Sequence, residues 1–577
     1  MNTDNKTDFE LLTTPFEADM PAVPWTEYPR PQLKRDSYLC LNGAWQLSCR
    51  RGKNEEMLGT ITVPFPPESK ISGIGRNFAK NDTLIYQRTF SLTEEFLRDR
   101  VLLHFGAVDQ EVYVFVNGKL AGHHTGGYWP FTLDVTTLLQ LGDNVLTAEV
   151  TDPLDTDQPY GKQRRKRGGM WYTPTSGIWQ TVWMESVPEN YITGIKTDIS
   201  DKAVTLHIQG GDPSKILTVT TPDGEEQFSF EGDTFTFAPE NPRLWSPEDP
   251  YLYHFTVTCG ADTVSSYFAF RTVGITQSGD RSLIALNGKP YFFHGLLDQG
   301  YFADGIFMPA TPEGFKQDIL RCKELGFNML RKHIKIEPDL FYYYCDLYGI
   351  IVFQDMINNG RYSFLRDTAL PTIGFKKGLP RRTSRRQREW FAHGAQKTLT
   401  LLNNHPCICY YTIFNEGWGQ HDADRLYTAL KKRDPSRIWD TASGWFRCRN
   451  TDVQSEHVYF KPVKLTATAD KPLVLSEFGG YSCKIEGHAF NLKKTYGYRH
   501  FETKEAFADA LDTLYRTQII PAIEDGLCAT VLTQVSDVED EVNGLFTYDR
   551  QVCKVDEAPM QQLADDLHAA FAKRWLA

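Results

Sequence analysis

The feature that most constrains the fold is a change of pattern near residue 286. From Leu41 to about residue 275, short runs of β-branched and aromatic residues alternate with turn signals such as Asn117-Gly118. After residues 286–290, strand-like runs alternate with segments of helical spacing. Short strands joined by hairpin turns predict β-sandwiches, whereas alternating strands and helices predict parallel β/α units. We therefore expect a multidomain β plus α/β protein.

The strand-rich part is long enough for two sandwiches. Residues 36–189 suit a first, jelly-roll-like β-sandwich, and residues 190–276 have the length of one immunoglobulin-like β-sandwich. Residues 1–35 are polar and contain five prolines, which predicts an extended N-terminal arm lying on the domain that follows.

Residues 277–577 predict a (β/α)8 TIM barrel. Threonine 311 is expected to cap a helix that begins at Pro312, and residues 504–520 have helical spacing. Eight strand-like runs in this part match the barrel fold. They cover residues 291–294, 328–333, 350–355, 408–416, 437–442, 453–459, 473–477 and 529–536.

Two glutamates end strands of this predicted barrel. Glu416 ends the fourth strand and Glu477 the seventh, each close to a glycine. Either one alone is more typical of a helix cap or a surface turn. As a pair at the C-terminal face of one barrel, they predict the acid/base and the nucleophile of a retaining glycosidase. We assign Glu416 as acid/base, because the neighbouring Phe414 and Trp418 would favour its protonated form, and Glu477 as nucleophile.

Further polar side chains fall at the same strand ends. A sugar presents many hydroxyls that need partners, so a cluster of such residues at one rim predicts a sugar-binding pocket, although each alone is more often structural. Trp418 is a candidate stacking platform. The substrate-binding candidates from this pattern are His333, Lys335, Asp355, Trp418, His457, Tyr459 and Gln534.

Charge and motifs exclude several classes of function. The net charge of −11 gives no global field for nucleic acid or an anionic membrane. Two basic runs, at 162–167 and 376–388, are either solvated loops or sites for an acidic sugar. Metal-ligand spacings and a phosphate loop are absent from the sequence, so we expect no metal and no cofactor.

Cysteine usage and the N-terminal sequence predict the compartment. The eleven cysteines occur without a C-x-x-C pair, which is typical of reduced thiols. The first residues lack a basic region followed by an apolar stretch, and no apolar run reaches membrane-spanning length. We expect a cytoplasmic protein that does not bind membranes.

The chain resembles glycoside hydrolase family 2 over nearly its whole length. The motifs are Leu41-Asn42-Gly43-Ala44-Trp45 and Ser176-Gly177-Ile178-Trp179 in the first sandwich, the strings Asn415-Glu416 and Ser476-Glu477-Phe478-Gly479, and the run 286–295 before the barrel. The resemblance implies a sugar-binding-type first sandwich and a retaining exo-β-glycosidase. It also implies that Asn415 hydrogen-bonds the sugar 2-hydroxyl and that Asp298 contacts substrate.

Departures from the family pattern leave the sugar open. His333 lies in Arg331-Lys332-His333-Ile334-Lys335, where the family has Arg-x-x-His, and Leu545 stands where glucuronidases carry a lysine. We expect a β-galactoside first, with a β-glucuronide, another acidic sugar or an arabinoside as the alternative. A carbohydrate-binding protein without catalysis is the alternative of another class. Sandwich surfaces of such proteins also allow a homodimer.

Overall fold

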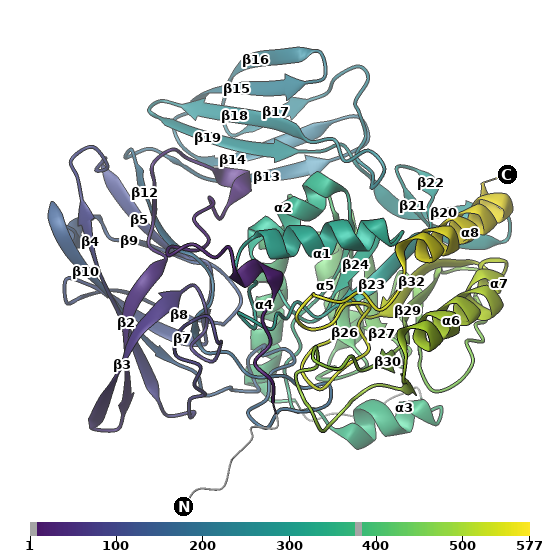
Figure 1. Cartoon of the computed structure of the whole chain (residues 1–577). Helices are drawn as coiled ribbons and strands as arrows, with labels where there is room; N and C mark the ends of the chain where they lie inside the picture. Colours follow the sequence, from purple (N-terminus) through teal and green to yellow (C-terminus); the bar gives the residue numbers. More distant parts are fainter. Residues whose placement is uncertain (1–8, 376–382, 577) are drawn as a thin grey trace, which may run out of the picture.

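The computed structural model describes residues 9–375 and 383–576, and Figure 1 shows three sheet-based bodies along this chain. The first is a sandwich of two antiparallel sheets, ordered β1-β12-β5-β9 and β3-β2-β4-β10-β7-β8. In β10, Leu146, Ala148 and Val150 are buried and the residues between them are half-exposed, which is the period-two pattern of a strand with one face in a core. The strands are β1 (Tyr38–Cys40), β2 (Gly43–Arg51), β3 (Asn54–Val63), β4 (Thr83–Leu92), β5 (Arg100–Phe105), β7 (Glu111–Val116), β8 (Lys119–Thr125), β9 (Phe131–Asp134), β10 (Gly142–Thr151) and β12 (Val182–Val187), with a small pair of β6 (Val108–Asp109) and β11 (Gly177–Ile178).

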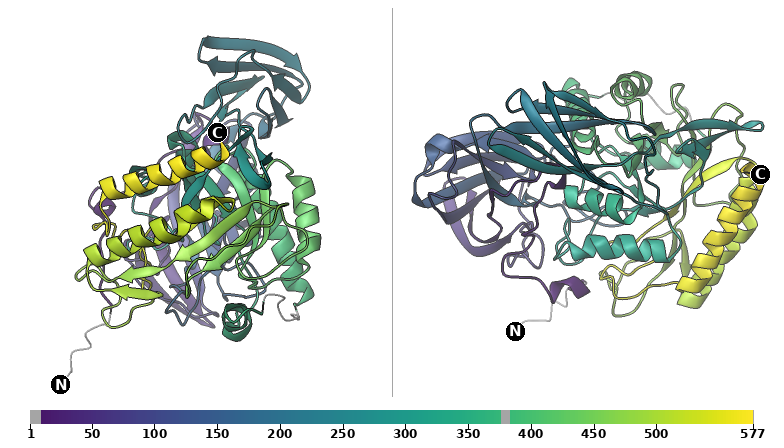
Figure 2. Two further views of the ribbon diagram at one scale, coloured as in Figure 1. Left: turned by 90° about the vertical axis from the view of Figure 1, so that its right-hand side faces the viewer. Right: turned by 90° about the horizontal axis from the view of Figure 1, so that it is seen from above.

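The second body is a smaller sandwich that projects from one end of the molecule in Figure 2. Its sheets are ordered β13-β14-β17 and β16-β15-β18-β19. Stacked and tilted rings of Phe237, Tyr253 and Phe268 fill its core. The strands are β13 (Ile192–Ile199), β14 (Val204–Gly210), β15 (Ser214–Thr221), β16 (Gly224–Glu231), β17 (Thr234–Phe237), β18 (Tyr253–Cys259) and β19 (Asp262–Phe268).

The third body is a parallel barrel of eight strands, ordered β27-β26-β25-β24-β23-β32-β29-β28. The ends of this order meet where Gly444 N, after β27, donates to Ser455 Oγ of β28. All eight predicted strands are present, with ends shifted by a few residues. They are β23 (Phe293–Asp298), β24 (Met329–Lys332), β25 (Ile351–Asp355), β26 (Ile408–Asn415), β27 (Ile438–Ser443), β28 (Gln454–Val458), β29 (Leu473–Gly479) and β32 (Leu527–Thr533).

Helices lie around this barrel. Helix α1 begins at Glu313 and has Pro312 as its N-cap, so the expected cap by Thr311 is wrong. The predicted helical stretch after residue 504 is confirmed, because α6 runs through a π turn into α7. The helices are α1 (Glu313–Glu324), α2 (Asp339–Tyr348), α3 (Leu370–Thr372), α4 (Arg385–Leu402), α5 (Ala423–Arg433), α6 (Lys504–Leu514), α7 (Ile520–Ile523) and α8 (Glu557–Trp575).

Short sheets complete the barrel domain. A three-stranded sheet of β20 (Val273–Ser278), β21 (Arg281–Leu286) and β22 (Lys289–Pro290) precedes β23. Arg281 Nε donates to Asp525 O and Ser282 Oγ donates to Ala469 O, just before β32 and β29 begin. This sheet therefore covers the N-terminal end of the barrel, opposite the predicted site. Strands β30 (Tyr481–Cys483) and β31 (Arg499–Phe501) pair in the loop after β29.

The N-terminal arm links all three bodies, and its first eight residues lie outside the described part. Phe9 stacks on Phe490 of the barrel domain, and the indole of Trp25 donates to Pro309 O. Residue 34 then pairs with Ser265 of the second sandwich. The arm is dark purple in Figure 1 and runs between the first sandwich and the barrel. The expected domain boundaries at 36, 190 and 277 stay a prediction.

Arg35, the last residue of this arm, lies in a buried cluster of charged residues. Its guanidinium donates to both carboxylate oxygens of Asp262 at 2.8 Å and to Glu185 Oε2 at 3.2 Å. Asp262 belongs to the second sandwich and Glu185 to the first, so one side chain joins both.

Within the described residues, no helix is both long and apolar enough to cross a bilayer. All eleven cysteines are described, and each is a free thiol. The cytoplasmic location stays a prediction.

Candidate active site

The paired glutamates meet at the C-terminal end of the barrel. Glu477 lies in β29 and is buried, whereas Glu416 follows β26 and is partly exposed. One carboxylate oxygen of each and one ring nitrogen of His457 all lie within 4.8 Å of one another. The predicted acid/base and nucleophile are therefore brought together.

The backbone turns sharply at Glu416. Its φ of 51° lies in the left-handed region, which is uncommon for a residue other than glycine. The Glu416 N–H donates to Ser443 O at 3.0 Å, and Gly417 follows at φ 70°. A Cβ atom on Gly417 would lie 2.4 Å from the ring of Phe446, so a glycine is required there. Such a turn directs the carboxylate into the mouth of the barrel.

Arg331 of β24 is the centre of the hydrogen-bond network below the pair. Its guanidinium contacts Asp355 Oδ1 at 3.0 Å, Glu477 Oε1 at 2.9 Å and Asn415 Oδ1 at 3.0 Å. The candidate list from the sequence omitted Arg331. The available signal was the adjacent charges of Arg331 and Lys332 in a barrel strand, where a buried charge is rare unless it is paired.

Glu477 is held in its ionised form. Burial by itself raises its pKa, but His457 and Arg331 beside it more than offset this, and the pKa falls to about 2. Tyr459 strengthens the effect by donating to Glu477 Oε2 at 2.5 Å. A carboxylate that stays ionised at neutral pH is what a nucleophile needs.

His457 of β28 lies between the two glutamates. The Arg331 guanidinium can only donate, and its Nη1 atom lies 3.4 Å from His457 Nε2, so Nε2 accepts. We therefore assign the ring hydrogen to Nδ1, which lies 2.9 Å from Glu416 Oε1 and 3.6 Å from Glu477 Oε2. His457 can thus donate to the first carboxylate and orient it toward the second.

His333 and Asp355 form a buried pair at the rim of the site. His333 Nδ1 lies 2.8 Å from Asp355 Oδ2 and 4.0 Å from Glu477 Oε1. Burial lowers the pKa of His333 to about 4, and the charge of Lys162 adds to this. His333 is consequently neutral at pH 7 and can accept or donate a hydrogen bond to a hydroxyl.

Lys335 does not meet the expectation of a substrate contact. It is buried, and its ammonium donates to Gly300 O at 2.5 Å, to Phe307 O at 2.7 Å and to Glu337 at 2.8 Å. These acceptors use all three of its hydrogens. Asp298 is likewise engaged, in a 2.5 Å ion pair with Lys332 and a hydrogen bond from Gly300 N.

Trp418 and Gln534 are also structural in this molecule. Trp418 is buried edge-on against Trp171 and Tyr160 of the first sandwich domain, and its indole donates to Gly360 O. Gln534 is fully buried and donates to Asn543 Oδ1 at 2.7 Å. Neither offers a surface to a sugar, because neighbouring protein groups cover both. The ring of Phe414 stacks on Phe391 of α4 and does not lie beside Glu416.

A segment of the first sandwich domain completes the rim. Between β10 and β11, Tyr172 OH donates to Glu541 Oε2 and Thr173 N donates to Glu539 Oε1. Arg167 pairs with Glu539 at 3.2 Å. The first basic run therefore reaches the site, where sequence reasoning left its role open. In the second run, residues 376–382 lie outside the described part, and Arg385 and Arg386 pair with Glu389 and Asp155.

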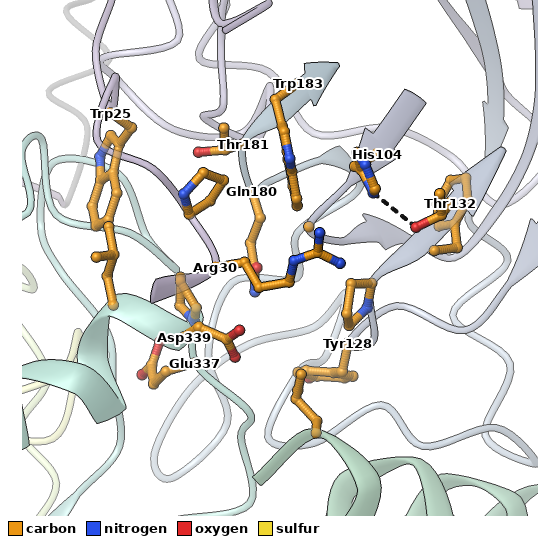
Figure 3. Close-up of a pocket in the computed structure, with 17 residues that line it drawn as sticks. Trp25, Arg30, His104, Tyr128, Thr132, Gln180, Thr181, Trp183, Glu337 and Asp339 are labelled. Atoms are coloured by element: carbon orange, nitrogen blue, oxygen red, sulfur yellow. Dashed lines mark hydrogen bonds between the residues drawn. The ribbon is translucent and has the colours of Figure 1, made fainter. Parts of the chain in front are cut away.

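Two cavities lie near this region. One, of about 430 Å³, is lined by Trp445, Phe460 and others, and by His457 and Tyr459, which contact Glu416 and Glu477. The other, of about 130 Å³, lies between the first sandwich and the barrel, and Figure 3 shows Arg30 and Asp339 among the residues that line it. This second cavity is lined neither by the glutamates nor by His457 or Tyr459, so it is separate from the candidate active site.

Two β-sandwiches followed by a parallel eight-stranded barrel with paired glutamates at its C-terminal face define a glycosidase-type barrel protein. Family models described as the sugar binding domain of glycosyl hydrolases family 2, as glycosyl hydrolases family 2 and as the TIM barrel domain of that family match residues 16–188, 195–271 and 279–554. The chain belongs to glycosyl hydrolase family 2.

Individual relatives are distant. A β-galactosidase of Priestia megaterium is 23% identical over 76% of this chain and 44% of its own length, so the chain spans less than half of that relative. A β-glucuronidase of Chlorocebus aethiops is 25% identical over 71% of this chain and 69% of its own. The solved structure of a β-D-glucuronidase from Dictyoglomus thermophilum superposes with a TM-score of 0.72 at 18% identity, covering 94% and 98% of the two chains.

Proposed function

We propose that this protein is a retaining exo-β-glycosidase, with Glu477 as nucleophile and Glu416 as general acid/base. The observation that carries the proposal is the spacing of the pair, whose oxygens lie within 4.8 Å. Retaining enzymes hold their carboxyl groups about 5 Å apart, whereas inverting enzymes need about 6.5–9.5 Å to admit a water.

In the first step the ionised Glu477 attacks the anomeric carbon, while Glu416 donates its proton to the leaving oxygen. In the second step Glu416 removes a proton from water, which then displaces the sugar from Glu477. Asn415 accepts from Arg331 through Oδ1, and its Nδ2 has no partner among the described residues. This amide can therefore donate to the sugar 2-hydroxyl, as the family resemblance implies.

Cleavage at the end of a glycan is supported by the way in which the rim of the site is closed on one side. The segment at residues 160–175 packs against the loop after β32 through Tyr172 and Thr173. A pocket closed on that side suits the end of a glycan better than its middle.

The test combines two variants with a panel of aryl glycosides. We expect Glu477→Gln to lose turnover by at least about 10⁴-fold on every sugar, because the covalent step has no nucleophile. Glu416→Gln should lose much less on an aryl leaving group that needs no proton. Exposed Glu389→Gln is the matched control and should retain wild-type rates. Proton NMR should show the β-anomer as first product; an α-anomer, or full activity of Glu477→Gln, would refute the assignment.

The same panel addresses the sugar. The β-galactoside is the first expectation from the sequence, and curated relatives carry both the β-galactosidase and the β-glucuronidase names. Comparing β-galactoside, β-glucuronide, β-mannoside and arabinoside substrates separates these candidates. Binding of a sugar without hydrolysis of any member would instead favour a non-catalytic carbohydrate-binding protein.

A further inference from the structure

We propose that Lys162, a residue of the first sandwich domain, binds the carboxylate of a terminal uronic acid in the barrel's active site. The proposal rests on the glycosidase function above and narrows its substrate to β-linked hexuronides. Four observations support it: the anchoring of the segment, its distribution of cations, the neighbours of Lys162, and the state of Glu541.

The backbone on both sides of Lys162 is fixed. Tyr160 N and Gly161 N both lie within hydrogen-bond distance of Asn358 O, which follows β25. A Cβ atom on Gly161 would lie 3.1 Å from Ile334 O, so this backbone touches the barrel next to His333. On the other side, Gln163 is fully buried and donates to Asp109 of the first sandwich. Lys162 is thus presented at the rim by a rigid support.

The arginines of the basic run all have partners. Arg164 stacks over the ring of Trp171 at 3.7 Å, and Arg165 donates to Phe78 O and Asp152 O. Arg167 pairs with Glu539. Lys162 differs from them, because its ammonium makes no hydrogen bond or ion pair within the described part of the chain.

The cations inside the barrel mouth are engaged as well. Arg331 pairs with Asp355 and Glu477, and Lys332 pairs with Asp298. Lys335 has no hydrogen left to donate, as described above. Leu545 is buried and carries no charge. Among these residues Lys162 is the cation that is available to an anionic ligand.

The charge of Lys162 acts on the site itself. It lowers the pKa of His333, whose ring lies 4.0 Å from the nucleophile Glu477, after the larger effect of burial. It also opposes the effect of burial on the pKa of Glu541. Lys162 therefore lies near both His333, which follows β24, and Glu541 in the loop after β32.

Glu541 does not compete strongly for this ammonium. Tyr172 OH and Asn543 Nδ2 donate to its two oxygens, and no ion pair within 4.0 Å joins it to Lys162. Burial raises the pKa of Glu541 and so favours its neutral form. A half-buried ammonium without a counter-charge is satisfied by a carboxylate far better than by a hydroxyl, since charge-assisted hydrogen bonds are about twice as strong as neutral ones.

The test compares Lys162→Met with Lys166→Met, an exposed lysine of the same run that serves as the matched control. Substrates are 4-nitrophenyl β-D-glucuronide, β-D-galacturonide and the neutral β-D-galactoside and β-D-glucoside. The wild type should prefer one of the uronides. Lys162→Met should lower kcat/KM on that uronide by about 10- to 100-fold, at least tenfold more than on its neutral counterpart. Lys162→Arg should restore part of the loss, and Lys166→Met should match the wild type.

Two results would overturn the proposal while leaving the glycosidase function intact. One is a wild type that hydrolyses neutral sugars and ignores both uronides. The other is an equal loss of kcat/KM on charged and neutral sugars in Lys162→Met, which would indicate a structural role for Lys162. If no substrate is turned over, calorimetry measures binding instead. Free D-glucuronate or D-galacturonate should bind the Glu477→Gln variant. The double variant, which also carries Lys162→Met, should bind it at least tenfold more weakly. Equal binding by both proteins, or binding by neither, would equally reject the assignment.

Discussion

At the scale of single residues, the site is built around one ionised carboxylate. Glu477 receives hydrogen bonds from Arg331 and Tyr459, and His457 lies close to its second oxygen. Each partner favours the charged form of Glu477, so the proposed nucleophile is ionised before substrate arrives. Preorganised donors of this kind are effective because the protein need not reorient them during the reaction.

Removing one of these donors should be measurable without dismantling the site. Tyr459→Phe deletes the hydrogen bond to Glu477 Oε2. We expect kcat to fall by about 10- to 100-fold, because a hydrogen bond to a charged group contributes roughly 1.5–3 kcal/mol. The pKa of Glu477 should rise, which moves the acid limb of the pH–rate profile to higher pH. Tyr113→Phe, an exposed tyrosine of the first sandwich, is the control. An unchanged acid limb would contradict this account of the nucleophile.

The same carboxylate should affect stability at low pH. Its pKa is lowered from 4.5 to about 2 in the folded protein. A depressed folded-state pKa contributes stability that is fully present above about pH 4.5 and is lost as pH falls through 2. The contribution is roughly 3 kcal/mol. Urea unfolding at pH 5, 4 and 3 should show a steeper loss of stability in the wild type than in Glu477→Gln, and parallel curves would refute it.

Sequence reasoning placed both glutamates at the barrel mouth but did not find the partners of several neighbours. Strand ends can be read from apolar runs, and a carboxylate at such an end faces the barrel mouth. Lys335 and Trp418 lie at equivalent places, yet Glu337 and two carbonyl groups engage the first and the sandwich aromatics enclose the second. Partners that come from another part of the chain leave no local signal. Arg331 carries a local signal, its charge within a buried strand, but its role follows from three partners on three other strands.

At the scale of elements, the barrel was predictable and the segment that completes it was not. Parallel strands are buried on both faces, so each reads as an apolar run, and all eight could be found. The segment at residues 160–175 has no such periodicity. It is positioned by individual contacts, among them the close approach of Gly161 to the barrel at Ile334.

That close approach gives a prediction for Gly161→Ala. The new Cβ atom would lie 2.7 Å from Tyr128 OH and 3.1 Å from Ile334 O, at a φ of 66°. We expect the segment to shift from the rim and kcat/KM to fall by about tenfold or more. Gly118→Ala has a similar φ of 76° with nothing within 4 Å, so it separates backbone strain from the clash. Gly118→Ala should cost roughly 1 kcal/mol of stability and leave activity unchanged. Equal activities of the two variants would show that the segment does not position the site.

At the scale of the whole molecule, the three bodies are joined by buried polar contacts. Arg35 is almost fully buried and bridges Asp262 of the second sandwich to Glu185 of the first. Breaking a buried ion pair leaves an uncompensated charge, which typically costs about 3–5 kcal/mol, whereas an exposed pair contributes about 0–1 kcal/mol.

Arg35→Met should therefore destabilise the protein strongly and separate the unfolding of the second sandwich from the rest. Differential scanning calorimetry is expected to show a second, earlier transition. Arg100→Met removes an exposed arginine that pairs with Asp134 and Glu189, and it should keep the wild-type profile. A single transition at the wild-type temperature in Arg35→Met would show that this cluster does not join the sandwiches.

The arm that links the bodies has a consequence for synthesis on the ribosome. Gln551 Nε2 donates to Thr13 O, and the two residues are 538 positions apart. At roughly 5–20 residues per second, Thr13 waits on the order of half a minute to two minutes after its own synthesis before Gln551 has been made. The sandwiches can fold during this interval, but the arm can complete its contacts only after the last strand of the barrel has been synthesised. Docking of the arm therefore follows synthesis of the barrel domain.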